Sequence, residues 1–182
     1  MMEKREKVSK IICFIFLIFF CFICLQFLSP AILRSNQIPD LSGSTIFEDN
    51  TEITKDLPFP INILYSYGDR ICHQKQERSF FINGNQMPFC SRCTAIWFGI
   101  PIGLFLLVFY TIELNEKILG MIIISILPLA IDGIGQLIGL WESTNILRVI
   151  TGLPVGIASG IAIGIICDEC SDIIKRKRLI KD

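Results

Sequence analysis

The fold is decided by the stretch from Cys72 to Ile112, which reads CHQKQERSFFINGNQMPFCSRCTAIWFGIPIGLFLLVFYTI. Its first part holds the only histidine of the chain, His73, and three of the eight cysteines. After Thr94 the sequence turns apolar and carries no charge as far as Ile112. A set of soft metal-ligand side chains therefore stands directly before a segment long enough to enter a membrane.

The composition is that of an integral membrane protein. Just over half of the 182 residues (52%) are hydrophobic, which is too many for an ordinary soluble domain. The chain has 17 basic and 17 acidic residues, so its net charge gives no case for a nucleic-acid partner. Four basic residues lie in the first ten positions and five in the last eight, next to apolar runs. The partner that this distribution predicts is the lipid bilayer.

Four apolar runs predict an all-α integral membrane protein with four transmembrane helices. The first run has eighteen residues, about 27 Å of helix against a hydrocarbon core of roughly 30 Å. We expect a basic cytoplasmic N-terminus at 1–10, transmembrane helices at 11–28, 94–112, 118–140 and 146–167, an extracytoplasmic linker at 29–70, a Cys/His motif loop at 71–93 between the first two helices, and a basic cytoplasmic tail at 168–182.

The first run allows two interpretations, a retained membrane anchor or the core of a cleaved signal peptide. The basic start suits both, but the run is longer than the roughly 7–15 residues of a signal-peptide core. We therefore favour the anchor. The linker that follows is rich in proline and polar residues and predicts little regular structure. Only Ile61–Tyr67 is a candidate strand or interfacial helix, with its tyrosines at the level of the lipid headgroups.

The basic ends also predict how the chain sits in the cell membrane. Lysine and arginine close to transmembrane helices favour the cytoplasmic side. Four helices return the chain to the side on which it starts, so both termini are expected in the cytoplasm. The Cys/His motif loop and the turn at Trp141–Asn145 are then both outside it.

Glycines predict tight helix packing. The fourth run has Gly152, Gly156, Gly160 and Gly164, each four residues after the last. Such a ridge lets another helix approach closely in a bilayer, where small residues favour association. The sequence leaves open whether the contact forms within one chain or in a homo-oligomer.

An acidic residue, Asp132, lies inside the third run, with Gln136 one helical turn away. A carboxylate at that depth costs roughly 3 kcal/mol on insertion scales, so it needs a partner or a proton. The nearest predicted partner is Arg148 at the start of the fourth run. Two alternatives remain: a neutral Asp132 that locks helices together, and a pair between Arg148 and Glu142 that leaves Asp132 alone.

The cysteines of the motif loop predict a metal site. Cys90 and Cys93 have a chelating spacing, and Cys72 and His73 would complete a zinc site of three cysteines and one histidine. Adjacent residues tend to point apart, so a second arrangement has three cysteine ligands with an open position and His73 as a nearby base. A third interpretation is a disulfide among these cysteines, which an oxidising exterior would favour.

The remaining cysteines give weaker signals. Cys13, Cys21 and Cys24 lie in the first run, where a free cysteine behaves as a small apolar residue. Cys167 and Cys170 have ligand-like spacing, but they are expected on the cytoplasmic side and cannot share an ion with the motif loop.

Motifs in both halves of the chain carry a resemblance to a known family. They are Cys72-His73-Gln74, Arg78-Ser79-Phe80, Asn83-Gly84, Cys90-x-Arg92-Cys93-Thr94, Asp132-Gly133, Gln136, Ser143-Thr144-Asn145, Arg148 and Thr151-Gly152. With them, the region from about 65 to 165 resembles a prokaryotic, largely archaeal, family of predicted multi-pass membrane proteins of unknown function. The resemblance implies a multi-pass membrane protein and no established activity.

The predicted topology brings the motif loop and the outer ends of the last two helices to one face, so we expect one outward-facing polar site. The candidate catalytic residues are His73, Asp132, Glu142 and Arg148, and Arg92, Gln136 and Asn145 are further polar candidates. One hypothesis is a membrane enzyme that acts on a lipid-linked or anionic substrate with a zinc-type metal. The alternatives are a transport or binding component with a structural zinc, and a thiol redox protein that uses the Cys-x-x-Cys pair.

Overall fold

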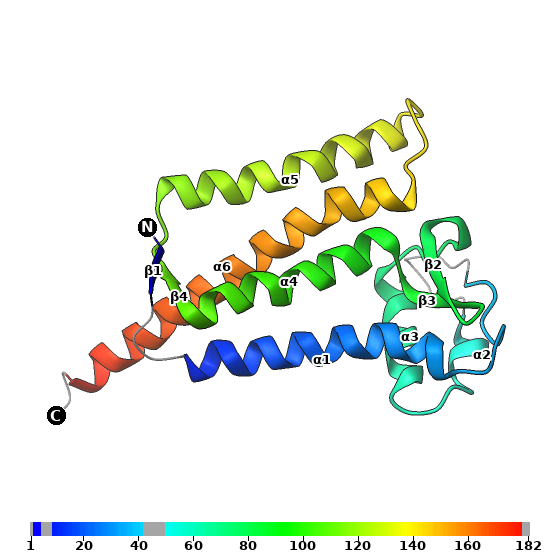
Figure 1. The fold of residues 1–182 in the computed structure, drawn as a ribbon, viewed down its shortest axis with the longest axis horizontal. Helices are drawn as coiled ribbons and strands as arrows, with labels where there is room; N and C mark the ends of the chain where they lie inside the picture. Colours follow the sequence, from blue (N-terminus) through cyan, green and yellow to red (C-terminus); the bar gives the residue numbers. More distant parts are fainter. Residues whose placement is uncertain (1, 5–8, 42–49, 180–182) are drawn as a thin grey trace.

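Four long helices form the body of the protein (Figure 1). The computed structural model describes residues 2–4, 9–41 and 50–179. Its long helices are α1 (Lys10–Ile32), α4 (Ser91–Phe109), α5 (Glu116–Leu137) and α6 (Asn145–Leu179). Each contains a segment long and apolar enough to cross a membrane, which in α6 is Asn145–Ile174. The predicted helical membrane fold with four spanning helices is confirmed.

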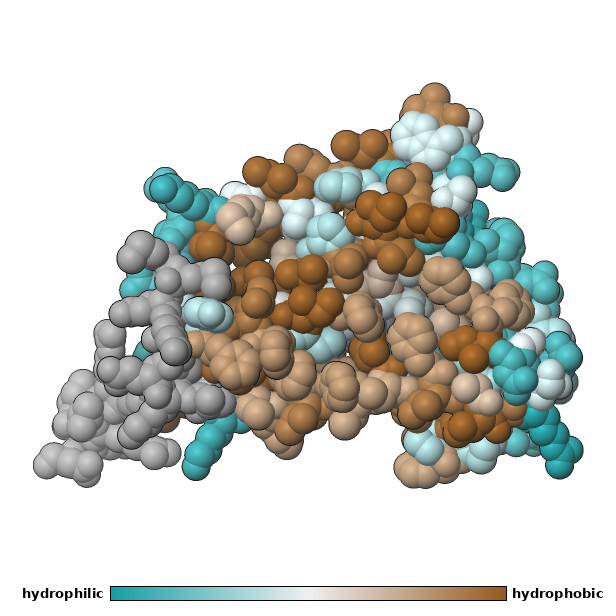
Figure 2. All heavy atoms as spheres, viewed as in Figure 1, coloured by the Kyte–Doolittle hydropathy of each residue, from teal (hydrophilic) through white to brown (hydrophobic). Residues whose placement is uncertain are grey.

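The helices lie side by side, with the short elements between residues 51 and 90 gathered at one end and the strands β1 (Met2–Lys4) and β4 (Tyr110–Ile112) at the other (Figure 1). α4 packs against both α1 and α6, and α5 packs against α6. The start of α1 and the end of α6 lie at the opposite end of the bundle from the Cys/His motif. Figure 2 shows a broad hydrophobic surface over the helices and hydrophilic residues at the end that carries the motif. This division is what a bilayer around the helices requires.

The glycines of α6 make a close contact with α4. A Cβ built on Gly156 would lie 2.2 Å from the carbonyl oxygen of Ile96. On the facing helix, a Cβ on Gly103 would lie 2.2 Å from the carbonyl oxygen of Ile157. The backbones therefore approach as closely as only glycine permits. The ridge therefore makes a contact within the chain, against α4.

Two of the spanning helices end at other positions than the sequence predicts. α4 ends at Phe109 rather than 112, because β4 (Tyr110–Ile112) pairs in antiparallel fashion with β1 (Met2–Lys4). α6 continues to Leu179, well past the predicted end at 167. Its last turns contain charged residues but no glycine or proline, so they can remain helical outside the apolar region.

α1 also runs further than predicted, through Ser29 and Pro30 to Ile32. A proline has no backbone N–H, so Pro30 cannot donate to the carbonyl of Gln26, four residues before it. The hydroxyl of Ser29 donates to that carbonyl instead, at 3.3 Å. The side chain thus satisfies the group that the proline leaves free, and the helix continues.

The linker contains more regular structure than the sequence predicts. α2 (Thr51–Thr54) and α3 (Ile61–Ile71) are both helical, so the helix was the correct alternative for the second of these segments. Tyr65 is fully buried and donates its hydroxyl to the carbonyl of Gln86 at 2.8 Å, so its side chain packs inside the protein. It belongs to a small core made by Leu33, Ile38, Leu41, Leu57, Ile61 and Tyr65.

The segment predicted as a motif loop is built around a β-hairpin. A short 3-10 turn, η1 (Gln76–Arg78), leads into β2 (Ser79–Ile82), which pairs with β3 (Asn85–Cys90) in antiparallel fashion. The turn residues Asn83 and Gly84 have φ of 55° and 74°. Asn-Gly adopts this geometry at low cost and is typical of two-residue hairpin turns.

Side-chain amides of the hairpin bind the linker to it. Oδ1 of Asn85 accepts a hydrogen bond from the backbone N–H of Ile38 at 2.9 Å. Oε1 of Gln86 accepts one from the backbone N–H of Leu41 at 2.8 Å. Both amides are fully buried. Residues 33–41 and 50–90 therefore form one folded unit at the end of the bundle, which we call the cap.

Candidate metal centre

Three cysteine thiols meet where the cap joins α4. Cys72 follows the last turn of α3, Cys90 ends β3, and Cys93 lies in the first turn of α4. Their Sγ atoms all lie within 4.8 Å of one another. Zn–S bonds of about 2.3 Å in a tetrahedral site separate the sulfurs by about 3.8 Å. Only small side-chain movements would therefore fit the three sulfurs around one such ion.

A close backbone contact brings Cys72 to the other two cysteines. A Cβ on Gly68, in the last turns of α3, would lie 2.0 Å from the carbonyl oxygen of Pro88 in β3. Only a glycine allows this approach. Gln74 Nε2 donates to the same carbonyl at 2.7 Å, and the backbone N–H of Cys90 donates to Sγ of Cys72 at 3.2 Å. The end of α3 is thus fixed beside the end of β3.

The three thiols form hydrogen bonds with one another, and these bonds shift the pKa values of Cys72 and Cys90 in opposite directions. All three are free cysteines. Hydrogen bonds from the thiols of Cys72 and then Cys93 lower the pKa of Cys90 to about 2. The hydrogen bond to Cys90, together with burial, raises the pKa of Cys72 to about 12. A thiolate therefore forms first on Cys90, and a metal ion that binds all three sulfurs must displace the other protons.

The thiols form one wall of a pocket of about 140 Å³. Its lining residues come from the cap, α4, α5 and α6, and they are Ile71, Cys72, His73, Arg78, Cys90, Arg92, Cys93, Gln136 and Arg148. The pocket is smaller than the roughly 300–1,000 Å³ of sites for drug-sized ligands. It therefore has room for a small chemical group rather than for a whole lipid.

The four predicted catalytic residues have different positions. His73 is exposed, lines the pocket, and lies outside the group of three close sulfurs. The geometry therefore fits three cysteine ligands with a histidine beside them. Arg148 lines the pocket as well, whereas Glu142 is exposed and is not among the lining residues. Asp132 is buried and contacts Arg92, which lines the pocket.

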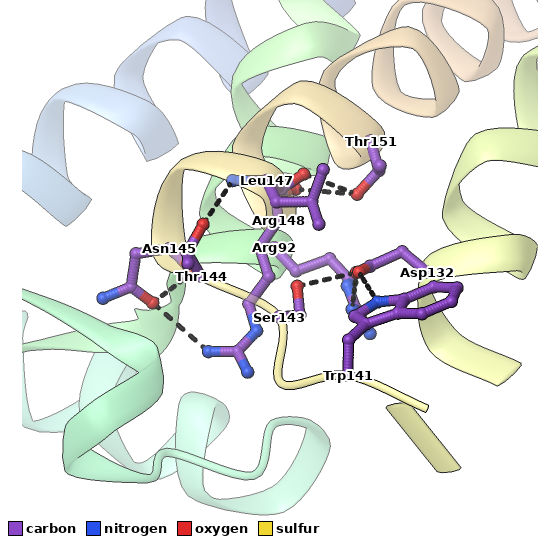
Figure 3. Close-up of polar contacts among 10 residues, drawn as sticks. Arg92, Asp132, Trp141, Ser143, Thr144, Asn145, Leu147, Arg148 and Thr151 are labelled. Carbon is purple, nitrogen blue, oxygen red and sulfur yellow. Dashed lines mark hydrogen bonds and ion pairs between the residues drawn. The ribbon is translucent and has the colours of Figure 1, made fainter. Parts of the chain in front are cut away.

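Asp132 lies at the centre of a polar network between α4, α5 and the loop before α6 (Figure 3). Its Oδ2 pairs with the guanidinium of Arg92 and accepts from Ser143 Oγ at 2.9 Å. Its Oδ1 accepts from Trp141 Nε1 at 3.3 Å. The prediction that Arg148 pairs with Asp132 is wrong. The start of α4 brings Arg92 to α5 instead. The side chain of Arg148 points away from Asp132 and toward Asn145 (Figure 3).

Each side chain of the Ser143-Thr144-Asn145 motif makes a different contact. Ser143 binds Asp132, as described. Oγ1 of Thr144 accepts from the backbone N–H of Leu147 at 3.2 Å and so caps the start of α6. Oδ1 of Asn145 accepts from Ser91 Oγ at 2.9 Å and from Arg148 Nη1 at 3.3 Å. The motif thereby ties the first turns of α6 to α4 and α5.

Asn145 also reaches the cap, because its Nδ2 donates to the carbonyl of Ser79 at 3.3 Å. The sequence placed Asn145 and Arg92 among the polar candidates, and both contact other site residues in the structure. It missed Arg78, Ser91 and Trp141 as parts of the site. The Asn-Gly pair between two apolar segments was the signal for the hairpin that brings Arg78 to the pocket.

The other five cysteines are not part of this group of ligands. Cys13, Cys21 and Cys24 are in α1, and Cys167 and Cys170 are in the part of α6 at the opposite end of the bundle. Within the described ranges, none of these five cysteines belongs to a group of three or more close metal-type ligands.

Comparisons with known proteins point in the same direction as the fold. A family model described as "Predicted membrane protein (DUF2085)" matches residues 72–162, half of the chain. An uncharacterized protein of Methanocaldococcus jannaschii is 44% identical over 95 residues, which are 51% of this chain and 61% of the relative. An uncharacterized protein of Methanothermobacter thermautotrophicus is 39% identical over 87 residues, which are 48% of this chain and 78% of the relative.

The match thus spans about three fifths of the length of the Methanocaldococcus relative. No solved structure matches the chain. The residues matched by the family model begin at Cys72 and include all three close cysteines, Asp132 and Arg148.

Proposed function

This chain belongs to the DUF2085 family of predicted membrane proteins, and we propose that it is a metal-dependent membrane protein whose Cys72, Cys90 and Cys93 bind a zinc-type ion. The observation that carries the proposal is the close approach of the three Sγ atoms at the wall of a pocket. Thiolates are preferred ligands of zinc, and here three separate elements each contribute one.

The arrangement favours an open centre over a closed structural one. A structural zinc site has four protein ligands, whereas this group of close ligands has three. All three thiols line the pocket, so a fourth position would face a bound molecule. When bound, the metal would supply Lewis acidity to that molecule. His73, on the pocket wall, is placed to accept or donate a proton, and we therefore favour a membrane enzyme.

We place the metal centre on the extracytoplasmic side. The basic residues near the first and last helices favour a cytoplasmic position for the chain ends. The cap lies at the other end of a bundle whose helices are long enough to span the bilayer. A substrate would then approach from outside the cell or along the outer leaflet.

A thiol redox function is the second candidate, and one observation favours it. Hydrogen bonds from the neighbouring thiols lower the pKa of Cys90, as in many reactive cysteines. The two candidates differ in what the purified protein contains. A metal centre binds an ion and keeps three thiols reduced, whereas a redox centre cycles between two thiols and a disulfide.

The experiment is metal analysis of the full chain purified in detergent without chelators. We expect about one zinc per chain, lost in Cys72→Ser and in Cys90→Ser. Cys170→Ser is the matched control, because Cys170 is exposed and lies at the opposite end of the bundle. Metal-free protein with a disulfide among the three cysteines would replace the metal proposal with the redox one. Equal zinc in all three variants would place the ion elsewhere.

A further inference from the structure

The pocket beside the three cysteines has an excess of positive charge. Arg78, Arg92 and Arg148 line it together. Asp132 pairs with Arg92, and Arg78 has a loose ion pair with Glu77, at 3.7 Å, whose carboxylate is largely exposed. With a divalent ion on three thiolates, the lining residues would carry five positive and three negative charges. Asp132 and Glu77, outside the lining, pair with Arg92 and Arg78, whereas Arg148 has no ion pair among the described residues. The positive charge of the pocket lining favours an anionic ligand.

Arg148 contributes most to this excess. It is 4% exposed, and its described hydrogen bond is to a neutral group, the amide oxygen of Asn145 at 3.3 Å. Cys90 and Asp132 attract this charge without a direct ion pair, and two neighbouring arginines repel it, so an anion bound beside Arg148 would lower the cost of burying it. Arg148 also lies in the first turn of α6, where the positive end of the helix dipole adds to its field.

Two further donors in the pocket lack acceptors. The Nε atoms of Arg78 and Arg92 are buried, and neither has a hydrogen-bond partner among the described residues. Glu77 Oε1 is 3.7 Å from Nε of Arg78, too far for a hydrogen bond. Buried polar atoms in folded proteins are nearly always paired, so orphaned donors on two residues of one pocket indicate a missing acceptor group. Guanidinium groups form strong paired hydrogen bonds with carboxylate and phosphate oxygens.

We propose that the pocket binds a phosphate group, with Arg148 and Arg78 as its principal protein ligands and the three-cysteine centre facing it. A tetrahedral phosphate has oxygens that point in several directions, so it can contact donors from the cap, α4 and α6 at once. A carboxylate has two oxygens in one plane and cannot serve donors on all sides. The pocket volume of about 140 Å³ suits a headgroup-sized moiety.

The phosphate could belong to a lipid headgroup or to a soluble phosphate ester, and both present the same chemistry to the arginines. The assignment of phosphate as the substrate group rests on the proposed metal centre, but phosphate binding itself is a property of the arginines. The two proposals can therefore fail separately, provided that the metal content is measured in the same samples.

The test is calorimetric titration of the full chain in a non-ionic, phosphate-free detergent. The probes are inorganic phosphate, water-soluble dihexanoyl phosphatidic acid and, as the carboxylate comparison, acetate. We expect phosphate to bind, and Arg148→Gln and Arg78→Gln each to weaken it about tenfold or more, since hydrogen bonds to charged groups are among the strong ones. Arg34→Gln is the matched control, because Arg34 is exposed in the cap and outside the pocket.

Each outcome decides something. No phosphate binding by zinc-loaded protein would overturn this inference and leave the metal centre standing. Phosphate binding by protein that purifies without metal and takes up no added zinc would overturn the metal centre and keep the anion site. Acetate that binds as tightly as phosphate would contradict the phosphate assignment. If phosphatidic acid binds at least tenfold more tightly than phosphate, the ligand is a lipid headgroup. If the two bind equally tightly, the ligand is a soluble phosphate ester. Arg148→Lys, which retains the charge, guards against a variant that fails to fold.

Discussion

Arg92 and Asp132 form a partly buried ion pair that joins the cysteine turn to α5. The two residues are forty positions apart, and Arg92 stands between Cys90 and Cys93 in the chain. The carboxylate also accepts hydrogen bonds from Ser143 and Trp141. α5 otherwise packs mainly along α6 and has few buried residues. The pair therefore connects the most loosely packed helix to the candidate metal centre.

Asp132→Asn should destabilise the protein by about 3 kcal/mol, because removal of one partner leaves a buried charge unpaired. This value is the lower end of the roughly 3–5 kcal/mol that breaking a buried ion pair costs, because the side chain of Arg92 is 23% exposed and water screens its charge. The free energy of unfolding in mixed micelles measures the effect. The double variant Arg92→Gln/Asp132→Asn should recover part of the loss, because two amides can bond to each other. Losses that simply add would show that the two side chains are not coupled.

The contact between α4 and α6 gives a second prediction. Gly156→Ala should destabilise the fold by roughly 1–3 kcal/mol, because the new methyl group meets the carbonyl oxygen of Ile96 and forces the helices apart. Gly120→Ala is the matched control, since no atom lies within 4 Å of a Cβ at that position in α5. It should be neutral or slightly stabilising. Equal effects of the two substitutions would contradict the intramolecular ridge.

The shared hydrogen bonds predict an unusual pH dependence for Cys90. Its lowered pKa keeps the thiolate present as the pH falls through the range in which an ordinary cysteine is protonated. In metal-free protein, alkylation of Cys90 by iodoacetamide should therefore change little between pH 8 and pH 6, as mass spectrometry of the modified peptide can measure. Cys72→Ala removes the main hydrogen-bond donor to Cys90. In this variant the rate at which Cys90 is alkylated should fall steeply as the pH falls. Ordinary pH dependence in the unmodified protein would refute the hydrogen-bonded triad.

The orientation in the membrane can be measured with a membrane-impermeant maleimide. A cysteine introduced at Glu77, an exposed position in the cap, should be labelled in intact cells when the native Cys170 is replaced by serine. In the parent protein, Cys170 should be labelled only after lysis. Labelling of the parent protein in intact cells also measures the signal from native cysteines near the pocket, which is subtracted from that of the variant. The opposite pattern would place the cap in the cytoplasm.

The sequence predicts the membrane helices well because their signal is local. A run of apolar residues needs no other part of the chain to identify it, and glycines four apart define a face of one helix. The ends were harder to predict. α4 stops at Phe109 because of strand pairing with residues at the other end of the sequence, and no local pattern contains that information.

The candidate site was only partly predictable for a similar reason. The Cys-x-x-Cys spacing and the buried Asp132 stand out in the sequence, but the choice between Arg92 and Arg148 as its partner depends on how α4 and α5 are rotated. The position of Arg78 depends on the hairpin, and the closeness of Cys72 depends on Gly68 against Pro88. These are long-range contacts, so one segment of sequence does not reveal them.

X-ray absorption at the zinc edge tests the central claim most directly, because it counts the atoms bound to the metal. On the zinc-loaded full chain we predict three sulfur neighbours at about 2.3 Å and one lighter neighbour at about 2.0 Å. Addition of phosphate should change the signal of the lighter neighbour only, and His73→Ala should leave all four neighbours in place. A metal with fewer than three sulfur neighbours, or a histidine signal that His73→Ala removes, would contradict an open centre made by Cys72, Cys90 and Cys93.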